Sequence, residues 1–391
     1  MKLKVYREGL VSIVAPDLEE YRVGRHVEPA WAPVFYNPRM IVSRDIGVAV
    51  VAAYARLTDR PLLIVEPLSA TGVRGLRYLV EGAPSANLIL NDINRLAYTL
   101  IKYNIKINSV IRKVKVFNTD ARILLDFIAN THLKPDIIDI DPFGSPVPFI
   151  DSAVRSIRDG GLLCVTATDL PPLLGIYPDT CLRKYGARSL RTEYAVELGA
   201  RILLGWLARE CGKYGKYIEP LLTQGTDHYI RVYVRVCRGK KKSASVLKQL
   251  GYLLHCFHCL HREVSNDLCG AATCPNCGKK LHSAGPLWTG SLWDSNFLQY
   301  VTKEYLARDY LSVRGAKIVR RILEESQGPP FFYRVDTIAS KAKLPHEPSP
   351  EIMVEKLREL GFVATLTHFC DKGFRCSASA KELFKLAEEL S

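Results

Sequence analysis

A carboxylate, a proline-fixed backbone and an aromatic ring follow one another directly at Asp141, Pro142 and Phe143. The apolar, β-branched residues before them are typical of a buried strand, and residues 142–146 are typical of a turn. Ligands of open α/β sheets bind just outside the carboxyl ends of the strands. A carboxylate that accepts an N–H hydrogen bond beside a stacking ring would there suit an exocyclic base amine. A lone Asp-Pro-Phe is a plain acidic turn that closes a strand about as often as it is a functional site. The interpretation therefore depends on the rest of the chain.

Three more acidic residues stand at the ends of predicted strands upstream. These strands cover residues 62–66, 86–92 and 114–120, and they end in Glu66, Asp92 and Asp120. The carboxyl ends of parallel strands meet at one edge of a sheet. There, an acid after the second strand suits ribose hydroxyls, and an acid after the third suits an adenine amine.

The turn after the first of these strands distinguishes two kinds of cofactor. A dinucleotide-binding turn needs G-x-G-x-x-G to bring its backbone against a pyrophosphate. The turn here keeps Gly72 and Gly75 but has Leu68 and Ala70 at the earlier glycine positions. S-adenosylmethionine has no pyrophosphate. Together with the acids at four strand ends, this turn predicts a methyltransferase that uses S-adenosylmethionine.

Strands and helices must alternate to position these residues. Further strands are predicted at residues 136–141 and 161–169, and a closing pair at 217–222 and 229–236. This alternation predicts an α/β fold with a mostly parallel sheet, the Rossmann-like fold of class I methyltransferases. We expect a smaller α+β part to follow it.

The segment before the sheet is rich in prolines and aromatic residues. Residues 29–38 contain three of each, which predicts an ordered, non-helical stretch that either covers the core or forms a wall facing the substrate. Ser43 is a plausible cap for a helix over residues 46–56. Arg44 near that helix start could hold a carboxylate group of a ligand.

Four cysteines have the spacing of a metal site. Two C-x-x-C pairs, separated by fourteen residues, predict a zinc ribbon with the ligands Cys256, Cys259, Cys274 and Cys277. A site closed by four protein ligands is structural, so we expect zinc to stabilise a small domain. The nearby side chains are expected to be bystanders or to support the ligands, although one histidine could replace a thiolate: His255, His258, His261 and Cys269.

The C-terminal part predicts a winged-helix-like module. Helices are expected at residues 318–325, 335–342, 351–360 and 381–390, with strands at 363–369 and 374–378. The basic stretch 238–243 is expected to be a linker, a phosphate contact or both. We therefore predict domains over residues 1–237, 238–300 and 301–391. Trp288 and Trp293 favour packing between elements over stacking on RNA.

The overall charge predicts a polyanionic partner. The 391 residues carry a net charge of +14, shared about equally between residues 1–237 and 238–391. No stretch is long enough to cross a membrane, and the N-terminus lacks the apolar core of a signal peptide. The eleven cysteines show no disulfide framework. We expect a cytoplasmic, monomeric protein.

Four segments resemble the tRNA (guanine-26-N2)-dimethyltransferases of archaeal type: residues 66–75, 91–94, 118–121 and 141–146. Their Leu-Ser-Ala-Thr-Gly and Asp-Pro-Phe-Gly-Ser-Pro sequences are more specific than general methyltransferase motifs. Residues 35–38, with Arg44 and Asp45, are similar to that family as well. The resemblance covers most of the chain.

The resemblance implies a cofactor site, a substrate site and a tRNA partner. Residues expected to contact S-adenosylmethionine are Arg44, Arg74, Asp92, Asp120 and Ala121, and we add Glu66 as the acid of the first strand end. Residues expected at the guanine are Asp141 and Phe143, with Phe35 on the facing wall. Family members often carry a structural zinc site, in agreement with the cysteine spacing.

Two other functions are compatible with parts of the sequence. An adenine-N6 or cytosine-N4 DNA methyltransferase uses a similar Asp-Pro-aromatic turn, but the Phe-Gly-Ser-Pro continuation disfavours it. A non-catalytic zinc-ribbon protein that binds nucleic acid is disfavoured by the intact acids at the strand ends. Asp139 lies two residues before Asp141 on the same strand face, so the sequence leaves open which carboxylate meets the base.

Overall fold

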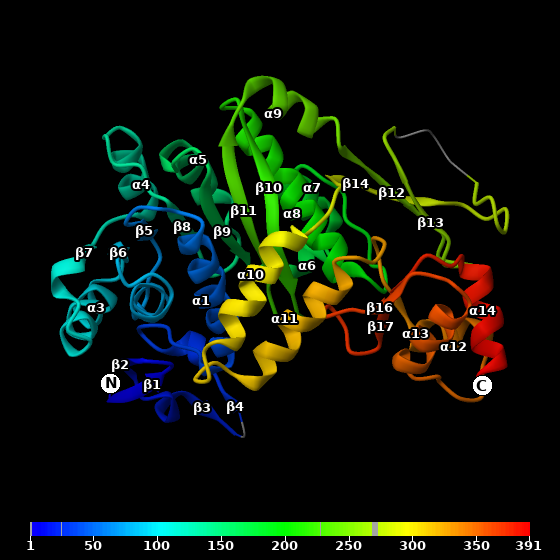
Figure 1. Cartoon of the computed structure of the whole chain (residues 1–391), viewed down its shortest axis with the longest axis horizontal. Coiled ribbons are helices and arrows are strands. Elements are labelled where there is room, and N and C mark those ends of the chain that lie inside the picture. Colours follow the sequence, from blue (N-terminus) through cyan, green and yellow to red (C-terminus); the bar gives the residue numbers. More distant parts are fainter. Residues whose placement is uncertain (1, 25, 227, 268–272) are drawn as a thin grey trace.

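The computed structural model describes residues 2–24, 26–226, 228–267 and 273–391 (Figure 1). Its centre is a seven-stranded sheet with the order β10-β11-β9-β8-β5-β6-β7. The five strands β5 to β9 are parallel, and β11 runs antiparallel to both β9 and β10. This confirms the predicted Rossmann-like sheet. The strands are β5 (Leu63–Glu66), β6 (Asn87–Asn91), β7 (Val114–Phe117), β8 (Ile137–Ile140), β9 (Gly161–Ala167), β10 (Lys216–Gly225) and β11 (Ile230–Arg238).

Every residue of the central strands β8 and β9 is buried, since helices cover both faces of the sheet. Helices α4, α5 and α8 pack against one another in series, and α8 also contacts β10 and β11. Helix α1 instead packs against the later helices α10 and α11. The helices of this part are α1 (Ile41–Arg56), α2 (Val73–Arg77), α3 (Arg95–Ile107), α4 (Ala121–Ala129), α5 (Val147–Ser156), α6 (Leu170–Leu173), α7 (Pro178–Tyr185) and α8 (Ala195–Gly212).

An N-terminal hairpin of β1 (Leu3–Glu8) and β2 (Val11–Pro16) packs on α2 and α3. A second, short antiparallel pair follows, β3 (Arg22–Val23) and β4 (His26–Val27). The hairpin is fastened by buried charges. Glu8 accepts hydrogen bonds from Arg44 at 2.6 and 2.7 Å and from Arg77 at 3.0 Å, while Arg77 also pairs with Asp45 and Glu81.

A three-stranded sheet in the order β13-β12-β14 carries the cysteine pairs. It consists of β12 (Leu250–His255), β13 (Arg262–Ser265) and β14 (His282–Trp288). The basic stretch expected to be a linker forms helix α9 (Lys240–Leu247), which packs on α8 and β10. Trp288 and Trp293 are buried, at 4% and 6% exposure, which confirms the expected packing role.

The C-terminal part lies at the other end of the molecule from β7 (Figure 1). Helices α10 (Ser295–Leu306) and α11 (Val313–Glu325) pack on α1 and belong to the main core. The expected helices and strand pair follow and bury a core of their own. They are β15 (Tyr333–Arg334), α12 (Val335–Ala342), α13 (Pro350–Glu359), β16 (Ala364–Leu366), β17 (Gly373–Cys376) and α14 (Ala380–Glu389). None of the described helices has the length and apolarity that a membrane span requires.

A buried glutamate joins this last module to the sheet. Glu325, at the end of α11, accepts hydrogen bonds from Thr367 at 2.6 Å and from Arg375 at 2.9 Å, and it contacts the His368 ring. His368 Nε2 in turn accepts the Gly225 amide at 3.2 Å, at the end of β10. Burial alone would raise the pKa of Glu325, but its interactions with His368 and Arg375 lower it to about 2.

The first prediction concerns stability in acid. The folded pKa of Glu325 lies below its unfolded value of about 4.3, so the ionised group stabilises the fold above that value. This contribution is lost as the pH falls toward 2. We expect Glu325→Gln to lower the free energy of unfolding at pH 7 by about 3 kcal/mol, and the difference from wild type to shrink below pH 4.

Urea unfolding at a series of pH values from 7 to about 2.5 measures this difference. The matched control is Glu324→Gln, the exposed neighbour on the same helix, which should leave stability nearly unchanged. A difference for Glu325→Gln that stays constant across the pH range would contradict the prediction.

Candidate active site

Asp141 lies directly after β8, at the start of the turn that the sequence predicted. Its Oδ2 accepts a hydrogen bond from Arg74 Nη2 at 2.6 Å, and its side chain remains 22% exposed. The turn continues through Gly144, whose φ of +87° is in the left-handed region that favours glycine. The Gly144 amide donates to Thr168 Oγ1 at 2.7 Å, which joins this turn to the end of β9.

The surroundings of Asp141 favour its ionised form. Burial alone would raise its pKa, but the charges of Arg74 and Arg231 outweigh burial and lower the pKa below its ordinary value. Hydrogen bonds from Thr166 and Arg74 act in the same direction. A carboxylate held in this way can accept an N–H from a ligand at neutral pH.

Asp139 is fully buried, unlike Asp141. Its two oxygens accept hydrogen bonds from Arg231 at 3.1 and 2.5 Å and from the Tyr78 hydroxyl at 2.7 Å. Its carboxylate therefore has partners inside the sheet and no exposed surface. Of the two acids that the sequence could not separate, Asp141 is the one that reaches the edge.

The turn after β5 brings Asp92 close to its backbone. Asp92 Oδ2 accepts the Ala70 amide at 2.8 Å, and its Oδ1 accepts the Asn94 amide at 2.8 Å. Ala70 and Gly72 have positive φ angles of 47° and 78°, so the turn is tight. Burial raises the pKa of Asp92, while the two amide hydrogen bonds oppose that rise.

Asp120 and Ala121 stand at the start of α4. Asp120 caps the helix through the Arg122 amide at 2.7 Å and pairs with the Arg122 guanidinium at 2.8 Å. The hydrogen bond from the Arg122 side chain lowers the pKa of Asp120 to about 2. Ala121 is buried at 4% exposure. The Asp120 side chain stays 23% exposed, beside the neighbouring strand end of Asp92.

Glu66 is buried where β5 meets α2. It accepts the Gly75 amide at 3.0 Å, and burial raises its pKa well above the ordinary value. A Cβ atom at Gly75 would lie 2.6 Å from both Glu66 Oε2 and a methyl group of Leu90. Only glycine lets the helix start approach the sheet this closely.

Arg44 lies in the charge cluster of the N-terminal hairpin. Its guanidinium bonds Glu8 and also the Asn37 carbonyl at 3.0 Å, and the side chain is 4% exposed. In this position Arg44 holds the hairpin and the proline-rich segment to α1. Its predicted contact with S-adenosylmethionine stays a prediction.

Two buried polar atoms in and just before α2 have no hydrogen-bond partner among the described residues. They are Arg74 Nη1 and Thr71 Oγ1, on α2 and in the turn before it. Unpaired buried donors are costly, so they indicate a missing ligand group. An anionic carboxylate fits Arg74, which agrees with the methionine end of S-adenosylmethionine. The residues present therefore fit this cofactor.

Phe35 and Phe143 face each other across the site. Their ring centroids are 4.4 Å apart with an interplanar angle of 76°, an edge-to-face contact. Phe143 is 69% exposed, so most of its ring surface is open to a ligand. A base between two parallel rings needs about 7 Å, two van der Waals contacts of about 3.5 Å. The rings must therefore separate before a base can lie between them.

The four predicted cysteines form one cluster. Their Sγ atoms all lie within 4.8 Å of one another, with Cys256–Cys277 and Cys259–Cys274 contacts of 3.5 Å. Tetrahedral zinc with bonds of about 2.3 Å places thiolates about 3.8 Å apart, so the cluster fits zinc. His255 bonds Tyr194 at 2.8 Å instead of joining the cluster. Cys269 lies outside the described residues.

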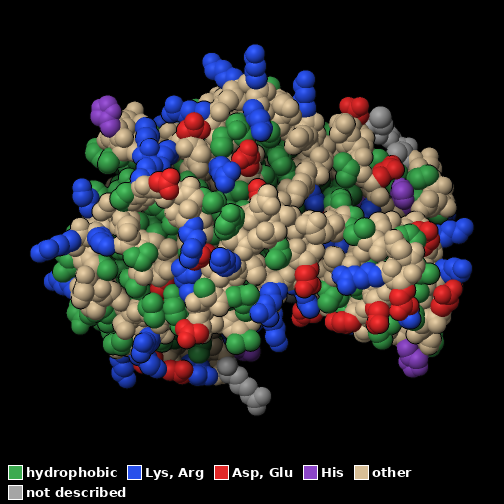
Figure 2. Space-filling model, in the orientation of Figure 1, with side chains coloured by type: hydrophobic (Ala, Val, Ile, Leu, Met, Phe, Trp, Pro, Cys, Tyr) green, Lys and Arg blue, Asp and Glu red, His purple; other side chains and the backbone are tan. Residues whose placement is uncertain are grey.

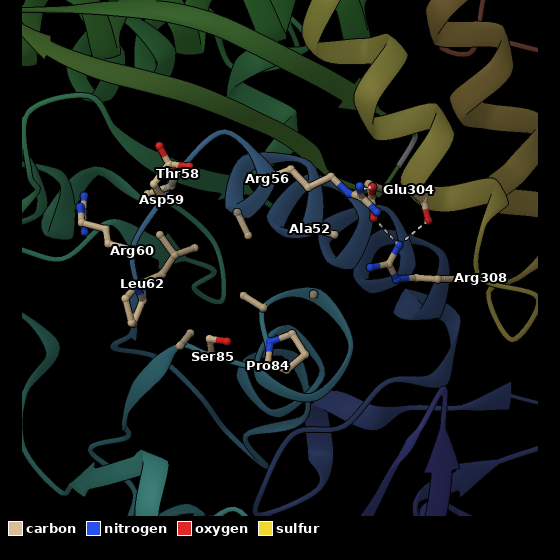
Figure 3. A pocket seen from close by; sticks show the side chains of 15 residues that line it. Ala52, Arg56, Thr58, Asp59, Arg60, Leu62, Pro84, Ser85, Glu304 and Arg308 are labelled. Atoms are coloured by element: carbon tan, nitrogen blue, oxygen red, sulfur yellow. Dashed lines mark hydrogen bonds and ion pairs between the residues drawn. The ribbon is translucent and has the colours of Figure 1, made fainter.

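A cavity of about 550 Å³ lies at the amino ends of β5 and β6 (Figure 3), whereas Asp141 follows the carboxyl end of β8. It is lined by the segments that precede β5 and β6 and by α10. Most of its charged groups already have partners: Glu304 pairs with Arg56 and Arg308, and Arg60 pairs with Asp136. This cavity lacks the acids of the strand ends and is not the candidate active site.

Comparison with known proteins identifies the family. The model of the family described as N2,N2-dimethylguanosine tRNA methyltransferase matches residues 14–388. The chain belongs to this family. A tRNA (guanine(26)-N(2))-dimethyltransferase of Methanosphaera stadtmanae is 39% identical over 99% of this chain and 97% of its own. An Aquifex aeolicus relative, named tRNA (guanine(26)-N(2)/guanine(27)-N(2))-dimethyltransferase, is 36% identical over 99% and 96%.

A solved structure agrees with this dimethyltransferase family. Trm1 from Pyrococcus horikoshii, in complex with S-adenosyl-L-methionine, matches with a TM-score of 0.84 and 33% identity. The match covers 98% of this chain and 99% of that one. The predicted family and fold class are thereby confirmed over nearly the whole chain.

Several polar residues of this dimethyltransferase site escaped the sequence reading. Thr71 lies in the turn that was interpreted from its glycines, and Thr168 follows β9 directly before Asp169. Thr166 and Arg231 face each other on β9 and β11, strands that seemed only to complete the sheet. Thr166 and Arg231 are each a polar residue inside an apolar strand, and this pattern could have indicated a functional role for both.

The second prediction concerns the ribbon of this dimethyltransferase. We expect Cys274→Ala to reduce bound zinc from about one ion per chain to nearly none and to lower the melting temperature by several degrees, because structural zinc stabilises its fold. Elemental analysis and thermal unfolding measure both changes. Cys237→Ala, a partly exposed cysteine outside the ribbon, is the control. Full zinc content in Cys274→Ala would contradict the assignment.

Proposed function

We propose that this protein transfers methyl groups from S-adenosylmethionine to the exocyclic N2 of guanine 26 in tRNA. The products are N2-methylguanosine and N2,N2-dimethylguanosine. The observation that carries the proposal is the exposed edge of Asp141, held ionised by Arg74 and flanked by the ring of Phe143. The names of relatives that match along nearly the whole chain support the same reaction.

The cofactor is held by the strand ends. Arg74 and Thr71 offer unpaired donors to its methionine end, Asp92 takes the ribose hydroxyls, and Asp120 takes the adenine amine. The buried Ala121 and Glu66 shape the floor of this region, and Arg44 supports it from α1. When bound, S-adenosylmethionine supplies an activated methyl group, so the protein contributes mainly position.

Asp141 prepares the amine for attack. The lone pair of guanine N2 is delocalised into the ring and is a poor nucleophile. By accepting one N–H hydrogen bond, Asp141 orients the amine, localises its lone pair and receives the proton that leaves. For the second methyl group, the remaining N–H of the monomethylated amine must turn to the same carboxylate.

Phe35 and Phe143 hold the base. Guanine 26 has to leave its stack in the tRNA, which costs a few kcal/mol. Stacking on an aromatic ring contributes roughly 1–3 kcal/mol per base and offsets that cost. The ring contact of 4.4 Å closes the site between turnovers and opens to admit the base.

The rest of the tRNA meets a basic surface. Lys and Arg side chains are spread over both halves of the molecule in Figure 2, in keeping with the net charge of +14. Phosphate contacts of this kind make affinity fall with salt. We propose that the protein acts in the cytoplasm as a monomer. Light scattering tests the monomer.

The assay uses labelled S-adenosylmethionine and unmodified tRNA transcripts, digested to nucleosides and separated by mass. N2-methylated guanosines that disappear when guanine 26 is replaced are the expected result. Replacing guanine 27 separately tests the second position named for the Aquifex aeolicus relative. Label on adenine or cytosine, in RNA or DNA, would overturn the proposal.

The third prediction concerns Asp141. We expect Asp141→Asn to keep cofactor affinity within a few-fold but to lower kcat by about 100-fold or more, because an amide is a far poorer acceptor for the leaving proton. Single-turnover methylation and calorimetric titration of S-adenosylmethionine measure the two effects. Asp151→Asn, the same change at an exposed site on α5, is the control. Near-normal turnover would remove Asp141 from the mechanism.

A further inference from the structure

A buried arginine lies beneath the candidate active site. Arg231 of β11 has no exposed surface, and it stands directly opposite Thr166 of β9 in the antiparallel register. Thr166 is equally buried. Thr166 lies on β9, the neighbour of β8, which ends just before Asp141, and Arg231 lies one strand further out on β11. Neither residue lies in the motifs that carry the family resemblance.

All five N–H groups of Arg231 have partners. Nε donates to the Tyr233 hydroxyl at 2.8 Å, and Nη2 donates to Asp139 at 2.5 Å and to the Tyr78 hydroxyl at 3.1 Å. Nη1 donates to Asp139 at 3.1 Å and to Thr166 Oγ1 at 2.5 Å. The guanidinium is therefore fixed in one orientation, since turning it would break several of these bonds at once.

This arrangement determines how the Thr166 hydroxyl is used. A hydroxyl has one proton to donate, and arginine can only donate. Because Thr166 Oγ1 accepts from Arg231, its own proton points to another acceptor. Ile140 of β8 stands opposite Val165 of β9, so Asp141 lies beside Thr166 at the next position of the parallel register. We take the Asp141 carboxylate as that acceptor, in agreement with its lowered pKa.

We propose that Thr166 is a positioning residue for methyl transfer, which orients the carboxylate of Asp141 while Arg231 orients Thr166. The proposal rests on the proposed function, in which Asp141 meets the guanine amine. Arg74 holds the same carboxylate from α2, at 2.6 Å. Two donors from different elements leave the carboxylate one orientation, so a free lone pair always faces the substrate.

The hydroxyl of Thr166 also has an effect on acidity. A donated hydrogen bond stabilises the ionised carboxylate and contributes to the lowered pKa of Asp141. Without the hydroxyl, the carboxylate would hold its proton up to a higher pH. Activity would then fall away at a higher pH on the acid side of the rate profile.

The test compares Thr166→Val, which keeps the shape and removes the hydroxyl, with Thr166→Ser, which keeps the hydroxyl. For Thr166→Val we expect kcat to fall about 10-fold to 100-fold, the acid limb of the profile to move to higher pH, and cofactor affinity to stay within a few-fold. Thr166→Ser should restore kcat to within about three-fold and return the acid limb to its wild-type position. Equal losses in both variants, or a wild-type profile in Thr166→Val, would overturn the proposal.

If Thr166→Val does not fold, Thr166→Ala and Thr166→Ser form a second pair that differs only in the hydroxyl. Thermal unfolding and cofactor titration verify the fold of each variant. A slower Thr166→Ala with a shifted acid limb supports the proposal, and equal kcat and profiles in the pair overturn it.

A double variant separates this proposal from the proposed function. If Thr166 acts through Asp141, adding Thr166→Val to Asp141→Asn should cause no further loss of turnover. An additional full loss in the double variant would show that Thr166 acts elsewhere. Normal turnover of Asp141→Asn alone would instead defeat the role of Asp141, whereas an inactive Asp141→Asn with a normal Thr166→Val defeats only the positioning role.

Discussion

The ion pair between Arg231 and Asp139 is the interaction on which the catalytic end of the sheet depends. Two charges without exposed surface lie between strands, where the cost of removing each from water is several kcal/mol. Hydrogen bonds from the Tyr78 hydroxyl and to the Tyr233 hydroxyl complete the network. Losing either partner would leave an uncompensated buried charge. Asp139 makes all its hydrogen bonds inside the sheet. Asp141, two residues later, is therefore the carboxylate that is left at the sheet edge to meet a ligand.

A second buried charge cluster fixes the opposite wall of the site, which carries Phe35. Glu8 accepts hydrogen bonds from Arg44, from Arg77 and from the Tyr36 hydroxyl at 3.1 Å. Tyr36 is buried, so the backbone beside it is fixed. The backbone of its neighbour Phe35 is therefore fixed, while the Phe35 ring is only partly buried. This suits a ring that must move aside for a base while its backbone stays in place.

Local patterns were sufficient for the strands of the central sheet, their order along the chain and the acids at their ends, because burial and turns affect adjacent residues. They did not predict the N-terminal strands β1 to β4. Partners distant in sequence have no such local effect: Arg231 bonds Asp139 across 92 residues, and Arg44 bonds Glu8 across 36. Helix α9 was missed because its three consecutive lysines suggested a solvated break, while only Ser243 and Val246 in it are buried. The metal cluster was foreseen because ligand spacing is itself local.

The C-terminal module meets the catalytic sheet at the tip of the β10–β11 hairpin. His368 accepts the Gly225 amide there, and a Cβ at Gly225 would lie 2.7 Å from Val196 and 3.0 Å from Phe369. Arg231 lies on the second strand of this hairpin. The module is thus packed against the element that carries the buried arginine, without a flexible linker between them. The module therefore braces the hairpin that carries Arg231, and the base reaches Asp141 by leaving the RNA stack.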